Sequence, residues 1–390
     1  MIGHAMTPLH FEFRTDSASS CDADPNADHG ADLDTRMHER PGIRMPGEFE
    51  PQDAMIIGCS TLVREAPQVF LNIVRALYRR IRLIGLVENE SGRTLASMLL
   101  ATASLPQDAI QMVRIPASSM WVRDYGPTTV IDDRGGRYFL DFDRRHLRPA
   151  NVQSATVELA SILDTPRLPI ELSLAGGNLL SNGDGVCVTS STVILQNSAG
   201  DRKVEQIGTE LCRYLGAQRW AYVSPLPGER TGHVDLICTF VSSDTLVVGR
   251  ADPSEDADYA SRLDKVADHM ARVQTRSGPL RIVRIPMPSS RDTHSRSYTN
   301  VVFANGTLLV PLYPETDGHL DRIAMEIYSR LLPGWEIVGI DVSSFSHLNG
   351  ALHCLTCNIP SAVPVRNVTA PPGLINPTPL DLAAGEPGMI

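Results

Sequence analysis

The sequence predicts a mixed α/β protein assembled from about five strand-rich units, each with one main helix. Two observations favour this fold class. Short apolar runs alternate with amphipathic stretches between residues 45 and 365, and the same cycle of strands and helix recurs along that region. The cycle indicates a repeated ββαβ architecture, although no clear sequence repeat accompanies it. We expect residues 45–365 to form a single domain.

The first part of this region predicts five strands and three helices. Short apolar runs predict strands at 54–59, 82–87, 111–115, 127–131 and 137–142. Amphipathic stretches predict helices at 66–80, 90–103 and 153–163.

The remainder repeats the pattern. Strands are expected at 186–189, 191–196, 219–223, 234–240, 244–248, 280–285, 299–304, 307–310 and 336–340. Helices are expected at 203–215, 257–273 and 317–332.

Two tails flank the predicted domain. Residues 1–44 carry many Asp, Ala and Ser residues and few large apolar ones, so they cannot repay the entropy of ordering and predict a disordered acidic tail. From residue 366 onward, prolines recur among small residues and exclude regular structure, which predicts a Pro-rich C-terminal tail.

Composition limits the partners. The net charge is -10, so the protein's field repels nucleic-acid phosphates and mildly favours a cationic ligand. The seven cysteines are an odd, scattered set, typical of reduced thiols. No apolar run approaches the roughly 18 residues of a membrane span, and the N-terminus lacks a signal-peptide pattern. We expect a cytoplasmic protein without nucleic-acid or membrane partners; a homo-oligomer stays open.

The segment WVRDYGP at 121–127 combines an aromatic ring, a base, an acid and a turn signal before an apolar run. The Asp124 carboxylate is suited to bind a guanidinium in bidentate fashion, and the face of Trp121 attracts positive charge. The alternative is a surface pair of Arg123 with Asp124 that closes a turn.

The segment TGHVD at 231–235 runs into an apolar stretch. In a strand, His233 and Asp235 would project from the same face, where an imidazole and an acid suit proton transfer to a departing amine. A purely structural His–Asp hydrogen bond is the alternative.

The segment LNGALHCLTC at 348–357 places His353 next to Cys354. A nearby cation, including a substrate guanidinium, would favour the nucleophilic thiolate of Cys354. A redox pair or half of a zinc site formed with Cys357 is less favoured, because no second such pair exists and the context is strand-like.

A fourth segment, AGGN at 175–178, marks a turn or a close approach of the backbone to a ligand. Together the four segments supply a thiol, an imidazole, two acids and an aromatic ring, which are the groups needed for covalent hydrolysis of an amidine.

Six ordered motifs between about residue 45 and residue 360 resemble the agmatine deiminase and bacterial peptidylarginine deiminase family of the guanidine-modifying (amidinotransferase) superfamily. They are MPGEFEP at 45–51, WVRDYGP at 121–127, GGN at 176–178, GHVD at 232–235, SYTN at 297–300 leading to LVP at 309–311, and HCLT at 353–356.

This resemblance implies a five-bladed pseudosymmetric ββαβ propeller, the pentein fold, with the active site in a central acidic well. It implies that Cys354 is the nucleophile, His233 the general acid and base, and Asp124 and Asp235 the guanidinium clamp. Trp121, Asn300, Gly177 and Asn178 are expected at the substrate site. The implied mechanism passes through a thiouronium intermediate and needs no metal or organic cofactor.

Two departures bear on the substrate. Agmatine deiminases usually carry an acid where this chain has Ala175, and Arg144, Arg145 and Arg148 resemble the arginines that bacterial peptidylarginine deiminases use on a substrate carboxylate. Such a cluster suits a carboxylate and repels the free amine of agmatine. We therefore expect a peptidyl or C-terminal arginine as substrate, with a merely solvated arginine cluster as the alternative.

Other functions stay open at this point. They are deimination of agmatine or another small guanidine, transfer of the amidino group to an amine, non-catalytic guanidine binding, and a thiol-redox role of Cys354 with Cys357.

Overall fold

The computed structural model describes residues 19–20, 42–116, 118–144, 154–198, 202–288, 295–348 and 350–362. The predicted tails therefore lie almost entirely outside the described residues. Within the described ranges, no helix is long and apolar enough to cross a membrane.

The first sheet joins the beginning and the end of the described chain. It contains β2 (Gln52–Gly58), β3 (Arg82–Val87), β4 (Gln111–Arg114) and β19 (Thr356–Pro360). Strand β19 is antiparallel to β2, and β2, β3 and β4 run parallel. The helical segments between these strands are α2 (Leu62–Glu65), α3 (Pro67–Leu77), α4 (Glu90–Thr102) and η1 (Gln107–Ala109).

The second and third sheets repeat the same order of one antiparallel and one parallel pairing. The second contains β5 (Thr128–Ile131), β6 (Arg137–Asp143) and β7 (Arg167–Ser173), with α5 (Val122–Tyr125) before it and α6 (Ser154–Ile162) within it. The third contains β8 (Leu180–Ser181), β9 (Val186–Ser190) and β10 (Arg219–Val223), with α7 (Thr192–Asn197) and α8 (Val204–Leu215). Strand β1 (Ser19–Ser20) pairs with β10.

The fourth and fifth sheets follow the same rule. The fourth contains β11 (Cys238–Ser242), β12 (Thr245–Arg250) and β15 (Arg281–Pro286), with α9 (Ala257–Met270) and the hairpin of β13 (Gln274–Thr275) and β14 (Gly278–Pro279). The fifth contains β16 (Val302–Ala304), β17 (Thr307–Leu312) and β18 (Glu336–Asp341), with α10 (Pro314–Leu331).

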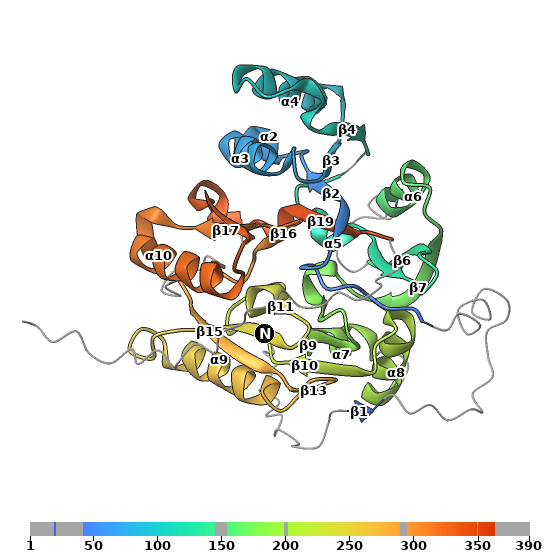
Figure 1. The fold of residues 1–390 in the computed structure, drawn as a ribbon, viewed down its shortest axis with the longest axis vertical. Helices are drawn as coiled ribbons and strands as arrows, with labels where there is room; N and C mark the ends of the chain where they lie inside the picture. The colour runs from blue at the N-terminus through green and yellow to red at the C-terminus, as the bar shows by residue number, and fades with distance from the viewer. Residues whose placement is uncertain are drawn as a thin grey trace, which may run out of the picture.

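Local sequence explains the main helices. Helix α3 buries one face, including Phe70, Ile73, Val74 and Leu77, at spacings of three and four residues. Helix α4 is capped at its N-terminus by Asn89, whose side chain accepts a hydrogen bond from the Gly92 N–H. Figure 1 shows the longer helices distributed around the outside of the molecule.

Neighbouring sheets share their apolar cores. The first and second sheets share an apolar cluster that includes Phe139. Another cluster links the second and third sheets, and another links the third and fourth. The largest cluster joins residues of the fourth and fifth sheets to β2, β3 and α3 of the first. The mixed α/β class predicted from the sequence is confirmed, and the five sheets form no single closed sheet in the described residues.

Two predicted strands are wrong. Residues 191–196, expected as a strand from the β-branched run Thr192-Val193-Ile194, belong to α7, because burial of Val193 outweighs a weak local preference. The expected strand at 234–240 begins instead with the 3-10 helix η4 (Val234–Leu236), in which the Ile237 N–H bonds to the Val234 carbonyl. Strands β7 and β19 were not expected from the sequence.

The cysteines differ in part from expectation. Five of them, Cys59, Cys187, Cys238, Cys354 and Cys357, are free and buried. Cys212 is disulfide-bonded, which corrects the expectation that all seven thiols are reduced.

Four short segments carry the candidate site. They are α5, η3 (Gly176–Asn178), η4 and η6 (His353–Leu355), whereas η5 (Ser343–Leu348) precedes the last of them. Helix α5 contacts both η3 and η6, and η3 contacts η4. The fold therefore brings together segments that lie far apart in the sequence.

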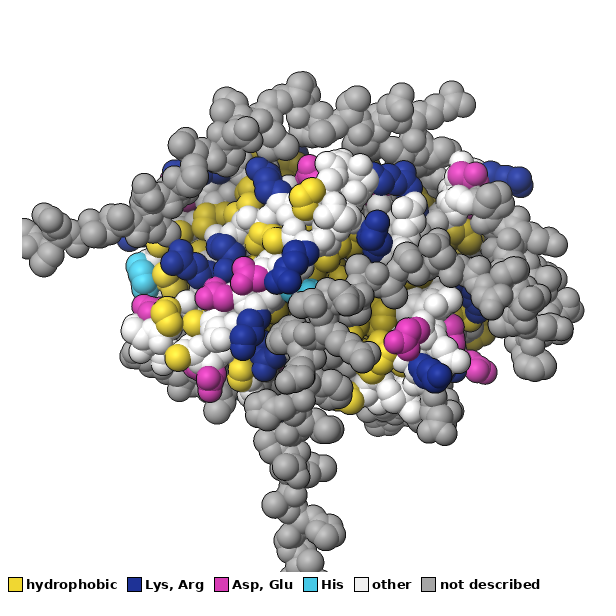
Figure 2. All heavy atoms as spheres, turned by 90° about the horizontal axis from the view of Figure 1, so that it is seen from below, with side chains coloured by type: hydrophobic (Ala, Val, Ile, Leu, Met, Phe, Trp, Pro, Cys, Tyr) yellow, Lys and Arg dark blue, Asp and Glu magenta, His cyan; other side chains and the backbone are white. Residues whose placement is uncertain are grey.

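Charge is mixed on the face seen in Figure 2. Basic and acidic side chains alternate there, so the net charge of -10 is not gathered into one patch on this face.

Candidate active site

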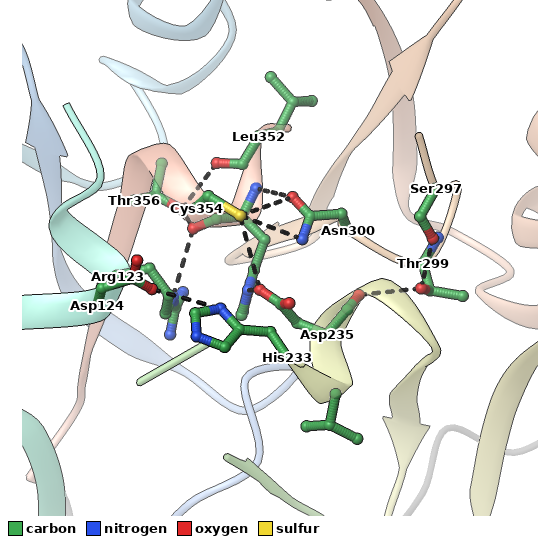
Figure 3. A network of polar contacts seen from close by, with 12 residues as sticks. Arg123, Asp124, His233, Asp235, Ser297, Thr299, Asn300, Leu352, Cys354 and Thr356 are labelled. Carbon is green, nitrogen blue, oxygen red and sulfur yellow. Dashed lines mark hydrogen bonds and ion pairs between the residues drawn. The ribbon is translucent and has the colours of Figure 1, made fainter. Parts of the chain in front are cut away.

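Cys354 lies in η6, directly before β19, and is buried. The Asn300 Nδ2 atom lies 3.5 Å from the thiol Sγ, and Asn300 Oδ1 lies 3.7 Å from it. Asn300 Oδ1 also accepts a hydrogen bond of 3.0 Å from the backbone N–H of His353. Asn300 thus holds the thiol and its backbone turn together, and Figure 3 shows the sulfur between Asn300 and the Asp235 carboxylate.

Asp235 lies in η4 and is only 1% exposed. Its Oδ2 atom lies 3.8 Å from Cys354 Sγ and accepts a hydrogen bond of 2.7 Å from His353 Nδ1. Thr299 Oγ1 donates to the Asp235 backbone carbonyl at 2.9 Å. Within the described part of the chain, Asp235 Oδ1 has no hydrogen-bond partner. A buried carboxylate oxygen in that state favours a cationic ligand beside the thiol.

His233 immediately precedes η4, and its ring faces Asp124 of α5 (Figure 3). The His233 Nδ1 and Asp124 Oδ1 atoms are 3.6 Å apart. Gly177 packs against this ring, because a Cβ at Gly177 would lie 2.6 Å from His233 Nδ1 and 3.2 Å from Asp235 Oδ2. His233 and Asp235 therefore approach the same point, although a 3-10 helix and not a strand places them there.

Asn178 supports the His233 segment. Its Oδ1 accepts the Ser190 N–H at 2.7 Å, and its Nδ2 donates to Thr192 Oγ1 at 2.8 Å. Ser190 Oγ donates in turn to the carbonyl of Gly232, the residue before His233. Both ends of the Asn178 amide are therefore engaged by protein, which favours a positioning role over the predicted substrate contact.

Trp121 packs against apolar and backbone neighbours. Trp121 packs on Phe345 with ring centroids 6.2 Å apart, and a Cβ at Gly350 would lie 2.3 Å from its ring. Its role in shaping the pocket stays a prediction.

Arg144 is 5% exposed and donates to Asp141 Oδ1 at 3.2 Å and to the Gly126 carbonyl at 2.8 Å. These bonds to the protein disfavour a direct substrate contact by Arg144. The other two predicted arginines, Arg145 and Arg148, lie outside the described residues.

Sequence reasoning missed a buried charged group behind the thiol. Arg123 donates to Glu48 Oε1 at 2.6 Å and to Asn358 Oδ1 at 2.8 Å. The His353 Nε2 atom lies 3.0 Å from Glu48 Oε2, while its Nδ1 bonds to Asp235. The signals available were the charged residue inside MPGEFEP and the histidine beside Cys354, but nothing in the sequence joins them.

Charges within this group oppose the effect of burial on the pKa values of Glu48 and His353. Burial raises the pKa of Glu48, but the Arg123 guanidinium and the His353 imidazole outweigh it and lower that pKa to about 2. Burial and Arg123 lower the pKa of His353, whereas Glu48 and Asp235 raise it, and the net direction is upward.

The surroundings of Cys354 disfavour its thiolate in the absence of a cation. Burial raises the pKa of Cys354 well above its usual range, and the carboxylates of Asp235 and Asp124 raise it further against a smaller opposite effect of Asn300. A cation placed between the two carboxylates would offset their charge and favour the thiolate. The geometry can therefore couple binding of a cation to activation of the nucleophile.

Cys357 does not share this environment. It lies in β19 with its thiol 3.4 Å from the Pro127 carbonyl, and it is not bonded to Cys354. In the described ranges, no three His, Cys, Asp or Glu side chains group as metal ligands.

Two solved structures of agmatine deiminases are similar to this chain. The agmatine deiminase of Enterococcus faecalis matches with a TM-score of 0.72 and 20% identity, over 83% of this chain and 97% of that one. A C. jejuni agmatine deiminase with substrate bound matches with a TM-score of 0.70 and 20% identity, over 81% and 96%. At these identities the likeness establishes the mixed α/β fold alone.

Residues 44–360 match the model of the Porphyromonas-type peptidyl-arginine deiminase family, and the chain belongs to that family. A Yersinia pseudotuberculosis protein named "putative agmatine deiminase" is 24% identical over 361 residues, covering 82% of this chain and 96% of that protein. The chain is therefore a hydrolase of the peptidylarginine and agmatine deiminase type, which acts on carbon–nitrogen bonds of linear amidines.

Proposed function

We propose that this chain hydrolyses an arginine-type guanidinium to a ureido group and ammonia, with Cys354 as nucleophile. The observation that carries the proposal is the buried Cys354 thiol, which lies 3.8 Å from Asp235 Oδ2. The other oxygen of the same carboxylate, Asp235 Oδ1, has no hydrogen-bond partner in the described chain. Asp235 and Asp124 bind the guanidinium, whose positive charge offsets theirs and favours transfer of the thiol proton to His233.

In the first half-reaction the Cys354 thiolate attacks the guanidinium carbon and forms a carbon–sulfur bond. The carbon–nitrogen bond then breaks, and His233 protonates the departing ammonia. A covalent thiouronium remains on the sulfur.

In the second half-reaction water attacks the same carbon, and the now neutral His233 accepts its proton. The carbon–sulfur bond breaks as the tetrahedral species collapses, releasing the ureido product and the thiolate. The 3.6 Å separation between His233 Nδ1 and Asp124 Oδ1 supports this acid–base role, because the carboxylate can orient the ring toward the reacting carbon.

The first candidate substrate is a peptidyl or C-terminal arginine. The family model and the neutral Ala175, which is 2% exposed and provides no charge for a free amine, favour it. Agmatine is the second candidate, because curated relatives carry that name and because Arg144 is engaged by Asp141 and Gly126.

The domain proposal is that residues 45–365 form one catalytic domain whose five sheets are the blades of a pseudosymmetric propeller. The repeated antiparallel-then-parallel pairing supports it, as do apolar clusters that link each sheet to the next and the last to the first. The site-bearing short segments would then lie near the common axis.

A colorimetric ureido assay tests the function. Agmatine, free arginine, a peptide with internal arginine and a peptide ending in arginine are compared, with Cys354→Ala as the control. We expect turnover of the arginine peptides and at least a thousandfold loss in Cys354→Ala. Turnover of agmatine alone would favour the second candidate, and absence of ureido product from all four would overturn the proposal.

A further inference from the structure

A continuous line of polar contacts leads from Arg123 to the thiol. Arg123 bonds to Glu48 at 2.6 Å, Glu48 lies 3.0 Å from His353 Nε2, and His353 Nδ1 lies 2.7 Å from Asp235 Oδ2. Asp235 Oδ2 is in turn 3.8 Å from Cys354 Sγ. The mechanism proposed above uses the last two residues and leaves the first three without a role.

The contacts of His353 define its protonation state by geometry. Both ring nitrogens face carboxylate oxygens, Nδ1 toward Asp235 and Nε2 toward Glu48. A neutral imidazole has one N–H, so its other nitrogen would present a lone pair to a carboxylate oxygen; an imidazolium donates to both. Glu48 is held as an anion by Arg123, so it needs a donor on this side.

The balance of charge agrees with this reading. With a neutral His353, the buried group of Arg123, Glu48 and Asp235 would carry one net negative charge next to the thiol. With an imidazolium the two anions and two cations cancel, which is the less costly arrangement for charges removed from water. The raised pKa of His353 points in the same direction.

We propose that His353 is a positioning residue: an imidazolium, held by Glu48, that fixes Asp235 Oδ2 so that Oδ1 is presented to the substrate and that offsets the charge of Asp235 beside Cys354. This inference rests on the proposed deiminase function for its consequence in catalysis. The protonation state and its effect on the thiol are properties of the resting protein and need no turnover.

The charged and titratable groups facing His353 come from three separate elements. They are Asp235 of η4, Arg123 of α5 and Glu48 of the segment before β2, with Cys354 next to it in η6. Asn300 fixes its backbone N–H from a fourth direction. His353 is buried, with only 3% of the residue exposed.

The first test observes the imidazole in the full wild-type chain labelled with ¹⁵N-histidine. We expect one histidine to keep the nitrogen shifts of an imidazolium at pH 8, where solvent-exposed histidines are neutral. That signal should disappear in His353→Asn and should titrate at lower pH in Glu48→Gln. A spectrum without any imidazolium at pH 8 would overturn the proposal even if neither variant folds.

The second test measures alkylation of Cys354 by iodoacetamide as a function of pH, followed by mass spectrometry of its peptide. Asn at position 353 can keep a neutral donor toward Asp235 while losing the charge. We expect the alkylation midpoint of His353→Asn to rise by at least one pH unit, with a tenfold slower reaction at pH 7. The matched control His347→Asn, at an exposed histidine of η5, should leave the profile unchanged.

An unchanged alkylation profile in folded His353→Asn would overturn the role assigned to its charge. If none of the four guanidines is turned over, the deiminase proposal fails, while both measurements still report on His353. The two failures are therefore distinguishable.

Discussion

At the scale of single residues, Gly177 is the position at which the site has no space for a side chain. A Cβ there would approach His233 Nδ1 to 2.6 Å, a separation that forces the ring to move. Because a displacement of about 1 Å in a catalytic group can cost about 100-fold in rate, we expect Gly177→Ala to lose at least tenfold in kcat/KM. Steady-state kinetics on the best substrate measure this.

The control for this variant is Gly318→Ala in α10, where a Cβ meets no atom within 4 Å. It should keep full activity. Wild-type activity in Gly177→Ala would mean that the His233 ring is not held where the proposed chemistry needs it.

The residue scale also shows what the sequence could and could not predict. Cys354, His233 and Asp235 were identifiable because their chemical types and motifs suit amidine hydrolysis, and the structure brings them together. Glu48 and His353 were not identified as partners, because they are 305 residues apart and only the tertiary fold brings them within 3.0 Å. The partners of Arg144 could not be predicted, since an arginine beside a strand end has the same sequence pattern whether it binds a ligand or the carbonyl of Gly126.

At the scale of elements, short helical segments and not long strands carry the candidate site. His233 and Asp235 were expected on the same face of a strand. The two side chains do approach the same point, but a turn and a 3-10 helix place them there. Gly232 has a φ of +68°, which turns the chain before η4 and redirects both side chains. Local propensity could not reveal this, because the turn is held by Ser190 and Thr192 from another part of the chain.

The connection between η3 and the His233 segment gives a prediction at this scale. Asn178→Ala would leave the Ser190 N–H without its acceptor, remove one donor to the Thr192 hydroxyl and loosen the Gly232 carbonyl that Ser190 holds. We expect a loss of about 1–3 kcal/mol in unfolding free energy, together with a lower kcat and an unchanged KM. A raised KM with unchanged kcat would indicate a direct substrate contact, as the sequence predicted.

Asn197 provides the matched control for this variant. It is also a buried asparagine, but its side chain bonds to Ser173 and Val193. Asn197→Ala should lower the unfolding free energy by a similar amount while the kcat of the folded protein stays unchanged.

At the scale of the whole molecule, the two ends of the described domain meet at the candidate site. Strand β19 near the C-terminus pairs with β2 near the N-terminus, and Glu48, which precedes β2, contacts His353, the residue before Cys354. Apolar periodicity predicted recurring α/β units, whereas closure was implied only by the family resemblance, because the strand-like context of Cys354 does not reveal which strand it pairs with. Apolar periodicity identifies elements, whereas closure depends on contacts between the most distant parts of the chain.

This closure makes global stability depend on the ionisation of a site residue. The pKa of Glu48 is lowered from 4.5 to about 2, so its contribution is fully present above pH 4.5 and is lost as the pH falls from 4.5 to 2. The pKa of His353 is raised from 6.5, so its contribution is fully present below pH 6.5 and is lost as the pH rises through the raised value. Stability from this pair is therefore greatest between about pH 4.5 and pH 6.5.

Removing the charge of Glu48 should reveal this dependence in urea unfolding measured from pH 3 to pH 9. At about 1.4 kcal/mol per pKa unit, we expect Glu48→Gln to be less stable than wild type by about 3 kcal/mol near pH 6, with the gap narrowing below pH 4.5. The exposed Glu336, paired with Arg80 at 2.8 Å, supplies the control Glu336→Gln, whose gap should stay below about 1 kcal/mol throughout. A Glu48→Gln gap that is the same at pH 6 and pH 3 would show that the lost stability comes from packing and not from the buried ion pairs that join the two ends of the domain.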